Sequence, residues 1–213
     1  MKYFIKTYGC QMNVADTERI AGWYESQGWQ AAQTIDKADE IVIVTCSVRQ
    51  TAEDRVYGLI NNLTKFKIKN LKLKIILTGC MLRYPLKWLH QKMPAVDEFK
   101  KISEFQTGNW KLAIRNSRAH AFVPIMEGCN QFCSYCVVPT ARGREKSRPF
   151  KEIICEVEEL VRRGYREITL LGQNVNSYGR DFSPTHRKKL SLIYHISIYD
   201  IQTTFALLLR VLN

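Results

Sequence analysis

Three cysteines, far apart along the chain, each stand directly after a short apolar run of the kind that forms a β-strand. The runs 2–9, 40–45 and 74–79 lead to Cys10, Cys46 and Cys80. The intervals between these cysteines are 36 and 34 residues, close to one strand, helix, strand unit of about 30 residues or more. This repeated placement predicts parallel strands joined by helices, and it restricts the fold more than any other feature.

The segments between these runs have the apolar spacing of helices. Residues 15–28 and 50–65 both repeat apolar side chains every three or four positions. Asp16 and Glu18 fall in the first turn of the earlier segment, where the helix dipole favours negative charge. We therefore expect an α/β domain with a mostly parallel sheet over residues 1–118.

The three cysteines are predicted to meet at one edge of this sheet. Parallel strands end at a common edge, where α/β proteins build their binding sites. Gly9 and Gly79 precede two of the cysteines and allow close approach of the backbone. We interpret Cys10, Cys46 and Cys80 as ligands of a metal cluster. The alternative is three buried cysteines that only pack, since free cysteine is often interior.

A second group of cysteines lies within eight residues, in the spacing C-x-x-x-C-x-x-C. Cys129, Cys133 and Cys136 supply three thiolates, and three thiolates can hold three irons of a 4Fe–4S cube and leave the fourth open to a small molecule. A structural zinc site needs four ligands, and no Cys or His closely follows Cys136, which disfavours zinc. The remaining Cys155 falls in a helix predicted over residues 150–164, and we expect no ligand role for it.

The cysteine content and the first residues indicate a reducing compartment. Seven is an odd number of cysteines, and residues 1–10 lack the apolar run of a secretory signal. A disulfide framework is therefore disfavoured, and we expect a cytoplasmic monomer whose thiols bind metal. No apolar segment is long enough to cross a bilayer, so we expect no membrane association.

The positive charge is concentrated in the middle of the chain. The formal net charge is +12, and residues 61–118 hold thirteen Lys and Arg against three Asp and Glu. The block includes Lys65, Lys67, Lys69, Lys72 and Lys74. Such a block attracts a polyanion and makes its binding salt-dependent. Lysine runs are usually only solvated, so RNA is the favoured partner only together with the chemistry described next.

Four motifs, in order along the chain, resemble those of the methylthiotransferase family of radical S-adenosylmethionine (SAM) enzymes. They are Thr7-Tyr-Gly-Cys-Gln-Met-Asn13, Thr45-Cys-Ser-Val-Arg49, Thr78-Gly-Cys80 and the cysteine-rich stretch 127–139, followed by a matching run at 142–148. The residues beside Cys10 and Cys46 resemble the MiaB-type branch, which acts on isopentenyladenosine in tRNA. The resemblance covers residues 1 to about 180.

The resemblance implies two 4Fe–4S clusters and SAM as cofactors. Cys129, Cys133 and Cys136 would hold the cluster that binds SAM and, when reduced, splits it into methionine and a 5′-deoxyadenosyl radical. Cys10, Cys46 and Cys80 would hold an auxiliary cluster that carries or supplies sulfur.

The implied reaction is methylthiolation of carbon 2 of isopentenyladenosine, next to the anticodon at tRNA position 37. An electron donor such as flavodoxin or ferredoxin is implied as well. Other branches of the family act on threonylcarbamoyladenosine or on a ribosomal protein, and both substrates stay open. A non-catalytic iron–sulfur or zinc protein that binds RNA is a further alternative.

Further predictions concern four residues other than cysteine near the implied SAM site. Residues 167–171 are predicted as a strand, and in a barrel the loop after a strand belongs to the active face. Gln173 and Asn174 are therefore candidates for binding SAM or the base, against a plain turn. Tyr135 is predicted to shield the cluster or lie near the SAM adenine, against a packing role.

Arg144 is the fourth of these residues. With Arg142 and Arg148 it is a candidate for contact with the SAM carboxylate or an RNA phosphate, as arginine often provides. The alternative for each of the three is solvated surface charge.

Residues 119–213 are predicted to form the first part of a radical SAM partial (β/α) barrel. A polar join near residues 115–119 leads to a first strand at 122–126. A complete barrel takes about 200 residues or more, whereas 95 residues follow position 118. We therefore expect an incomplete radical SAM domain without the family's C-terminal TRAM domain. We also expect an unpaired strand edge, and impaired or absent activity in this C-terminally truncated chain.

Overall fold

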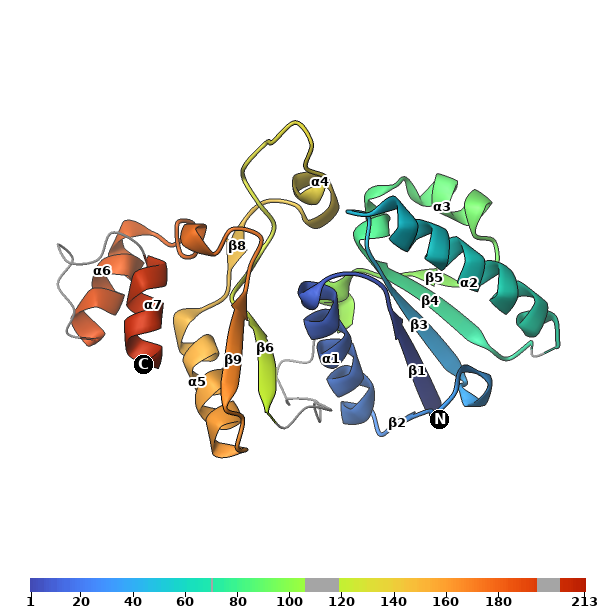
Figure 1. Ribbon diagram of the computed structural model, residues 1–213, viewed down its shortest axis with the longest axis horizontal. Helices are drawn as coiled ribbons and strands as arrows, with labels where there is room; N and C mark the ends of the chain where they lie inside the picture. Colours follow the sequence, from blue (N-terminus) through green and yellow to red (C-terminus); the bar gives the residue numbers. More distant parts are fainter. Residues whose placement is uncertain (70, 106–118, 195–203) are drawn as a thin grey trace. The chain divides into compact units, whose positions relative to one another are not determined.

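The chain forms two compact units in the computed structural model (Figure 1). The structure describes residues 1–69, 71–105, 119–194 and 204–213. The first unit comprises Met1–Arg115 and Tyr135–Ala141, and the second comprises Asn116–Ser134 and Arg142–Asn213. The polar join expected near residues 115–119 lies, apart from its last residue, outside the described residues.

The first unit is built on a parallel sheet of five described strands, which confirms the predicted fold class. Its strands are β1 (Lys2–Thr7), β2 (Gln30–Ala31), β3 (Glu40–Thr45), β4 (Lys74–Gly79) and β5 (Glu98–Phe99). The order across the sheet is β2-β1-β3-β4-β5. The chain therefore moves from β1 toward one edge and from β3 toward the other. In such sheets ligands bind outside the carboxyl ends of the strands at this reversal.

Helices cover both faces of this sheet. They are α1 (Gln11–Ser26), α2 (Gln50–Lys69) and the short α3 (Leu86–Lys92). Figure 1 shows α1 on one side of the sheet and α2 and α3 on the other. Along β3, Ile41 and Ile43 pack in the core beneath α2, while Val42 and Val44 pack in the core beneath α1. Because both faces are covered, every residue of β3 is buried, and its sequence is almost continuously apolar.

The helices differ from the predicted ones in their ends. The first begins at Gln11 instead of residue 15, because Cys10 is its N-cap and Asn13 Oδ1 accepts the Cys10 N–H at 3.3 Å. The second continues to Lys69 instead of residue 65. Its last turn is anchored by an ion pair between Lys67 and Asp97, and lysine there also suits the negative end of the helix dipole.

The second unit contains one pair of parallel strands among its described residues, β6 (His120–Pro124) and β9 (Glu167–Leu171). Two short strands, β7 (Met126–Glu127) and β8 (Lys146–Ser147), pair antiparallel. The strand expected at 122–126 is thus divided into β6 and β7. The reason lies at Ile125, whose N–H donates to Leu171 O at 2.8 Å while its carbonyl accepts from Arg148 N at 2.8 Å. The chain changes its strand partner at this residue.

Helix α5 (Phe150–Arg162) packs against β6 and against α7 (Thr204–Leu212) in the second unit, which also contains α6 (Pro184–Ile193). The five-residue α4 (Val138–Arg142) follows the cysteine-rich run, and all but its last residue belong to the first unit. The predicted helix after residue 150 is confirmed, and it buries Phe150, Ile153, Val157 and Leu160. Val161, on the same helix, is 58% exposed. Successive helical residues are about 100° apart, so Val161 turns away from the line of Ile153, Val157 and Leu160.

Replacing Gly79 with alanine should destabilise the first unit. Gly79 has φ +93°, and an added Cβ would lie 2.5 Å from Thr45 O and 2.8 Å from Thr45 N. We expect Gly79→Ala to lower the free energy of unfolding by about 1–3 kcal/mol, the usual cost of a strained backbone. Urea unfolding followed by circular dichroism measures it.

Gly58→Ala is the matched control for this substitution. Gly58 lies inside α2, and an added Cβ would meet nothing within 4 Å. This change should raise stability by about 0.5–1 kcal/mol, because alanine favours a helix interior. Equal unfolding midpoints for the two variants would contradict the proposed close contact at Gly79.

Candidate functional site

Cys10, Cys46 and Cys80 stand at the carboxyl edge of the parallel sheet, where three neighbouring strands end. Cys10 follows β1, Cys46 follows β3, and Cys80 opens a 3-10 turn (Cys80–Arg83) after β4. Thr45 and Gly79, the residues before two of them, are register partners in the β3–β4 ladder. Cys46 and Cys80 are buried and Cys10 is exposed. The loops that carry the three thiols are therefore neighbours.

A buried set of hydrogen bonds, here named the Thr45 junction, ties these loops together. Its members are Asn13, Thr45, Thr78 and Met81. The Thr45 hydroxyl donates to Thr78 O at 2.6 Å and accepts the Met81 N–H at 3.1 Å. The Thr45 carbonyl accepts Asn13 Nδ2 at 2.8 Å. Asn13, Thr45 and Thr78 are all fully buried. Because water does not reach these groups, they depend on one another for their hydrogen bonds.

The glycines before two of the cysteines lie against the neighbouring cysteine loops. Gly9 has φ +138°, and an added Cβ would lie 2.9 Å from Cys46 Cβ and 2.5 Å from Asn13 Oδ1. The segment that leads to Cys10 thus lies directly against Cys46. Gly79 lies in the same way against the backbone of Thr45. A side chain at either glycine would push two cysteine loops apart.

Two of the sulfur atoms accept backbone N–H groups, whereas Cys10 Sγ donates to Asn13 Oδ1 at 3.2 Å. The Val48 N–H donates to Cys46 Sγ at 3.5 Å. In the cysteine-rich loop, the Gln131 N–H donates to Cys129 Sγ at 3.4 Å. Among the described residues, no three His, Cys, Asp or Glu side chains converge as the ligands of one ion would. The ligands of an iron–sulfur cube bind different irons, so they need not converge on one point.

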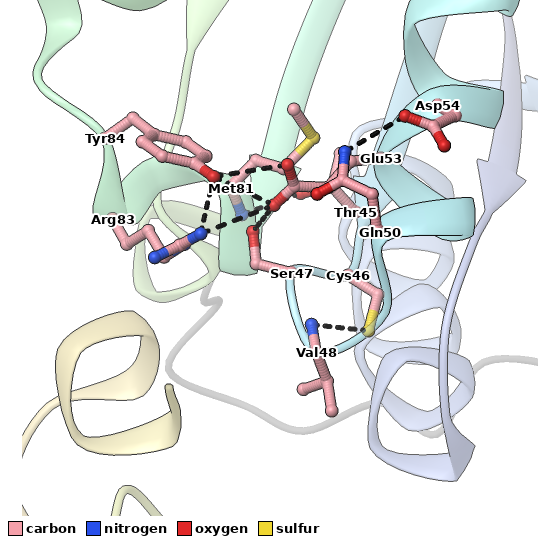
Figure 2. Close-up of polar contacts among 10 residues, drawn as sticks. All are labelled: Thr45, Cys46, Ser47, Val48, Gln50, Glu53, Asp54, Met81, Arg83 and Tyr84. Carbon is pink, nitrogen blue, oxygen red and sulfur yellow. Dashed lines mark hydrogen bonds and ion pairs between the residues drawn. The ribbon is translucent and has the colours of Figure 1, made fainter. Parts of the chain in front are cut away.

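A buried carboxylate lies beside Cys46 and Cys80. Figure 2 shows Glu53 at the centre of a polar cluster with Ser47, Arg83 and Tyr84. Ser47 Oγ donates to Glu53 Oε1 at 2.5 Å, and the Tyr84 hydroxyl lies 3.2 Å from Oε2. Arg83 Nη2 lies 3.7 Å from Oε1. Burial and the Glu53 carboxylate raise the pKa of Tyr84, against the opposing effect of Arg83, so its hydroxyl stays a donor.

The cysteine-rich loop holds its first cysteine firmly. The Cys129 N–H donates to Gly143 O at 3.1 Å, and Cys129 is buried. Gly128 has φ +74°, and an added Cβ would lie 2.1 Å from Arg144 O. Cys133 is exposed and Cys136 is half-buried. Cys155 is exposed on α5, as a residue without a ligand role can be.

The further predictions near the implied SAM site have different outcomes. Tyr135 is 89% exposed, and both interpretations of it stay predictions. Gln173 Oε1 is buried and has no hydrogen-bond partner among the described residues, as expected of a side chain that awaits a polar ligand. Asn174 Nδ2 donates to Ser177 Oγ at 2.7 Å within its own turn, which favours the plain-turn alternative for that residue.

The arginines near the loop also differ. Arg148 donates to Glu156 at 2.8 Å and to Pro124 O at 2.7 Å, and both charged side chains are nearly buried. This pair holds α5 against β6, so Arg148 has a structural role. Arg144 is exposed, with its guanidinium 5.2 Å from the centre of the Phe132 ring. Arg144 thus keeps its charge toward solvent.

The lysine run at residues 65–74 lies away from the cysteines. It spans the end of α2 and the start of β4, at the amino edge of the sheet. Helix α2 has 20 residues, about 30 Å at 1.5 Å per residue, and its first turn is the one near the cysteine edge. Lys67 pairs with Asp97, and Lys74 with Glu98. The described lysines of this run therefore stand apart from the three thiols.

Sequence reasoning missed three residues that shape this edge, namely Asn13, Glu53 and Tyr84. Asn13 had a usable signal, since a polar residue three positions after an N-cap commonly bonds back to it, but the helix was predicted to begin only at residue 15. Glu53 and Tyr84 had none, because their partners are distant in sequence.

No helix in the described part of the chain is long and apolar enough to cross a membrane.

Two protein-family models match successive parts of the chain. Residues 2–100 match the uncharacterized protein family UPF0004, and residues 123–207 match the Radical SAM superfamily. The first match covers the parallel-sheet unit with Cys10, Cys46 and Cys80. The second covers the end of β6, the cysteine-rich loop and all of β9. Members of the radical SAM superfamily use SAM and a 4Fe–4S cluster.

Curated relatives match both parts together, and each is called a tRNA-2-methylthio-N(6)-dimethylallyladenosine synthase. The protein from Dictyoglomus thermophilum is 43% identical over 205 residues, which cover 84% of this chain and 47% of that protein. The protein from Clostridium novyi is 43% identical over 211 residues, with 86% and 46% covered. The protein from Dehalococcoides mccartyi is 42% identical, with 92% and 48% covered. The chain spans about half the length of these relatives.

Replacing Thr45 with valine should destabilise the chain more than the same change elsewhere. Valine keeps the size but leaves Thr78 O and the Met81 N–H unpaired in a buried place. We expect a loss of about 1–3 kcal/mol in the free energy of unfolding. Urea unfolding measures it, with Thr64→Val as control.

Thr64 lies on the exposed side of α2, where its hydroxyl donates only to Ile60 O of the same helix. Its replacement should change stability by about 0.5 kcal/mol or less, as for most surface positions. If both valine variants lost the same stability, the Thr45 junction would have no special part in holding the sheet edge.

Proposed function

Because the chain belongs to the methylthiotransferase family of radical SAM proteins, we propose that it modifies tRNA by methylthiolation. The proposed reaction replaces the hydrogen on carbon 2 of isopentenyladenosine next to the anticodon, giving 2-methylthio-isopentenyladenosine. The names of the relatives support this substrate, since dimethylallyladenosine and isopentenyladenosine denote the same nucleoside. Carbon 2 carries a C–H bond that is too weakly acidic for acid–base catalysis, so a radical route is required.

The observation that carries the proposal is the meeting of three cysteine loops at the Thr45 junction. Three thiols at one sheet edge are the donor set of an iron–sulfur cluster with one open iron. The Val48 N–H, which is directed at Cys46 Sγ, suits a thiolate ligand. We assign Cys10, Cys46 and Cys80 to this auxiliary cluster. The assignment makes residues 1–118 the domain that handles sulfur.

The second assignment concerns Cys129, Cys133 and Cys136. We propose that they hold the cluster that binds SAM, within the radical SAM domain at residues 119–213. The buried, unpaired Oε1 of Gln173 supports a polar ligand at the loop after β9. Arg144 offers an exposed cation for a carboxylate or a phosphate. Tyr135, fully open to solvent, is free to cover a ligand.

The protein's own residues position and protect the reacting groups. When bound, the clusters supply the electron that splits SAM and the sulfur that becomes the methylthio group. Burial of Cys46 and Cys80 keeps water from their sulfur atoms. The N–H groups of Val48 and Gln131 stabilise negative charge on Cys46 and Cys129. Gly9 and Gly128 keep the backbone close enough for these contacts.

Partners and location follow from this chemistry as further proposals. The polyanion suggested by the charge of +12 is then tRNA, attracted over long range by the lysine run. A low-potential electron donor such as flavodoxin or ferredoxin is required, and free thiols are stable in a reducing cytoplasm. We expect a monomer.

Iron content tests the two assignments separately. The chain reconstituted without oxygen should hold about eight irons, four for each cube. Cys129→Ala and Cys10→Ala should each remove about half of the iron, because each substitution opens one cluster. Cys155→Ala should keep all of it, since that thiol is exposed on α5. One or two zinc ions in place of iron would favour a non-catalytic RNA-binding protein.

The substrate is tested by the nucleosides of a strain that lacks the gene. Mass spectrometry of its tRNA should show isopentenyladenosine without the methylthio group. The native gene should restore the modification, and the gene carrying Cys129→Ala should not. Loss of methylthio groups from threonylcarbamoyladenosine or a ribosomal protein instead would show that the chemistry is right and the substrate wrong.

A further inference from the structure

We propose that Glu53 is a positioning residue for the auxiliary cluster, and that it acts by clamping together the loops of Cys46 and Cys80. The inference rests on the proposed function of Cys10, Cys46 and Cys80 as cluster ligands. Glu53 itself is no ligand, because its carboxylate is already engaged by side chains from both loops (Figure 2).

The first contact acts on Cys46. Ser47, the next residue, donates its hydroxyl to Glu53 Oε1 at 2.5 Å, and both residues are buried. One residue further, the Val48 N–H donates to Cys46 Sγ at 3.5 Å. Anchoring Ser47 therefore fixes the tight loop that points the Val48 N–H at the sulfur. Without the anchor, that loop is free to turn the N–H away.

The second contact acts on the loop of Cys80. Arg83 and Tyr84 end the turn that Cys80 begins, and both reach Glu53. Arg83 also donates to the Tyr84 hydroxyl at 2.5 Å and lies 4.2 Å from the centre of its ring. The two side chains thus form one rigid group, and its position relative to Ser47 is set by the shared carboxylate.

The charge on Glu53 makes the clamp rigid. Glu53 is 4% exposed and lies in the first turn of α2, where the helix dipole favours a carboxylate. Arg83 is only partly buried and its Nη2 lies 3.7 Å from Glu53 Oε1, and an ion pair of this kind adds little net stability compared with well-packed apolar residues. Stability alone is therefore a poor reason for this carboxylate, whereas fixed geometry beside two cysteines is a sufficient one.

Glu53 complements the Thr45 junction. Thr45 immediately precedes Cys46 and holds the strand end, while Ser47 immediately follows it and is held by Glu53. Cys46 is thus fixed on both sides of its own residue. Cys80 is held from the residues that follow it, by Met81 at the junction and by Arg83 at Glu53.

Glu40 offers a matched control at the opposite edge of the same sheet. It is 8% exposed, accepts the Tyr24 hydroxyl at 2.5 Å, and stands at the start of β3, whereas Cys46 follows the end of that strand. Glu40→Gln removes the same charge from the same kind of buried hydroxyl contact. It leaves the cysteine edge untouched.

The test uses the full chain with Cys129→Ala, Cys133→Ala and Cys136→Ala, so that bound iron reports the auxiliary cluster alone. Glu53→Gln, Glu40→Gln and Cys46→Ala are added to it one at a time. Iron retention is measured against a chelator, the midpoint potential by redox titration, and the unfolding temperature by circular dichroism.

We expect Glu53→Gln to weaken iron retention by about 10-fold or more, the usual effect of losing a group that orients a metal ligand. The midpoint potential should fall, because an N–H directed at sulfur stabilises the more negative reduced state. Glu40→Gln should lower the unfolding temperature as much as Glu53→Gln does. Its iron retention and midpoint potential should equal those of the parent chain. Ser47→Ala should behave like Glu53→Gln, and Ser47→Thr, which keeps the hydroxyl, should restore retention.

Two results would overturn the inference in different ways. If Glu53→Gln and Glu40→Gln retain iron equally while Cys46→Ala loses it, the cluster stands and the clamp is wrong. If Cys46→Ala also retains its iron, the proposed auxiliary cluster fails, and the role of Glu53 fails with it. If Glu53→Gln does not fold, Ser47→Ala decides the matter by the same measurements.

Discussion

The arrangement of the first unit depends on one buried hydroxyl, that of Thr45. It bonds the carbonyl of Thr78 on the next strand and the N–H of Met81 beyond it, while the Thr45 carbonyl holds Asn13 of α1. Three segments distant in sequence are joined at one residue that water does not reach. In a medium of low polarity such bonds are stronger, and an unmet partner is more costly. The sheet edge is therefore rigid where its cysteines begin, before any contact between the thiols themselves.

The strands and their common edge were predictable because they depend on local patterns. Runs such as 40–45 are apolar throughout, which is required of a central strand with both faces covered. The interval from one cysteine to the next reports the length of a connecting helix. Helix ends were less predictable, since they depend on single contacts. Cys10 caps α1 through Asn13, and the last turn of α2 is fixed by Asp97 from another segment.

The functional details that sequence reasoning missed depend on contacts between distant residues. Glu53 looks like an ordinary polar residue in the first turn of a helix, and only the fold brings it to Arg83 and Ser47. The sequence did not place the lysine run for the same reason, because a count of charges does not tell which edge of a sheet they occupy. Arg148 resembled its neighbours in sequence, but its burial against Glu156 separates it from them.

The topological reversal between β1 and β3 has a consequence for how the protein acquires iron. Cys10, Cys46 and Cys80 are neighbours only after β1, β3 and β4 have paired; in the unfolded chain they are tethered 36 and 34 residues apart. A cluster held by all three thiols therefore binds to the folded chain and not to the unfolded one. By thermodynamic linkage, its binding energy adds to the stability of the fold. Cluster binding and folding of the sheet are then linked, so a change in the stability of one changes the stability of the other.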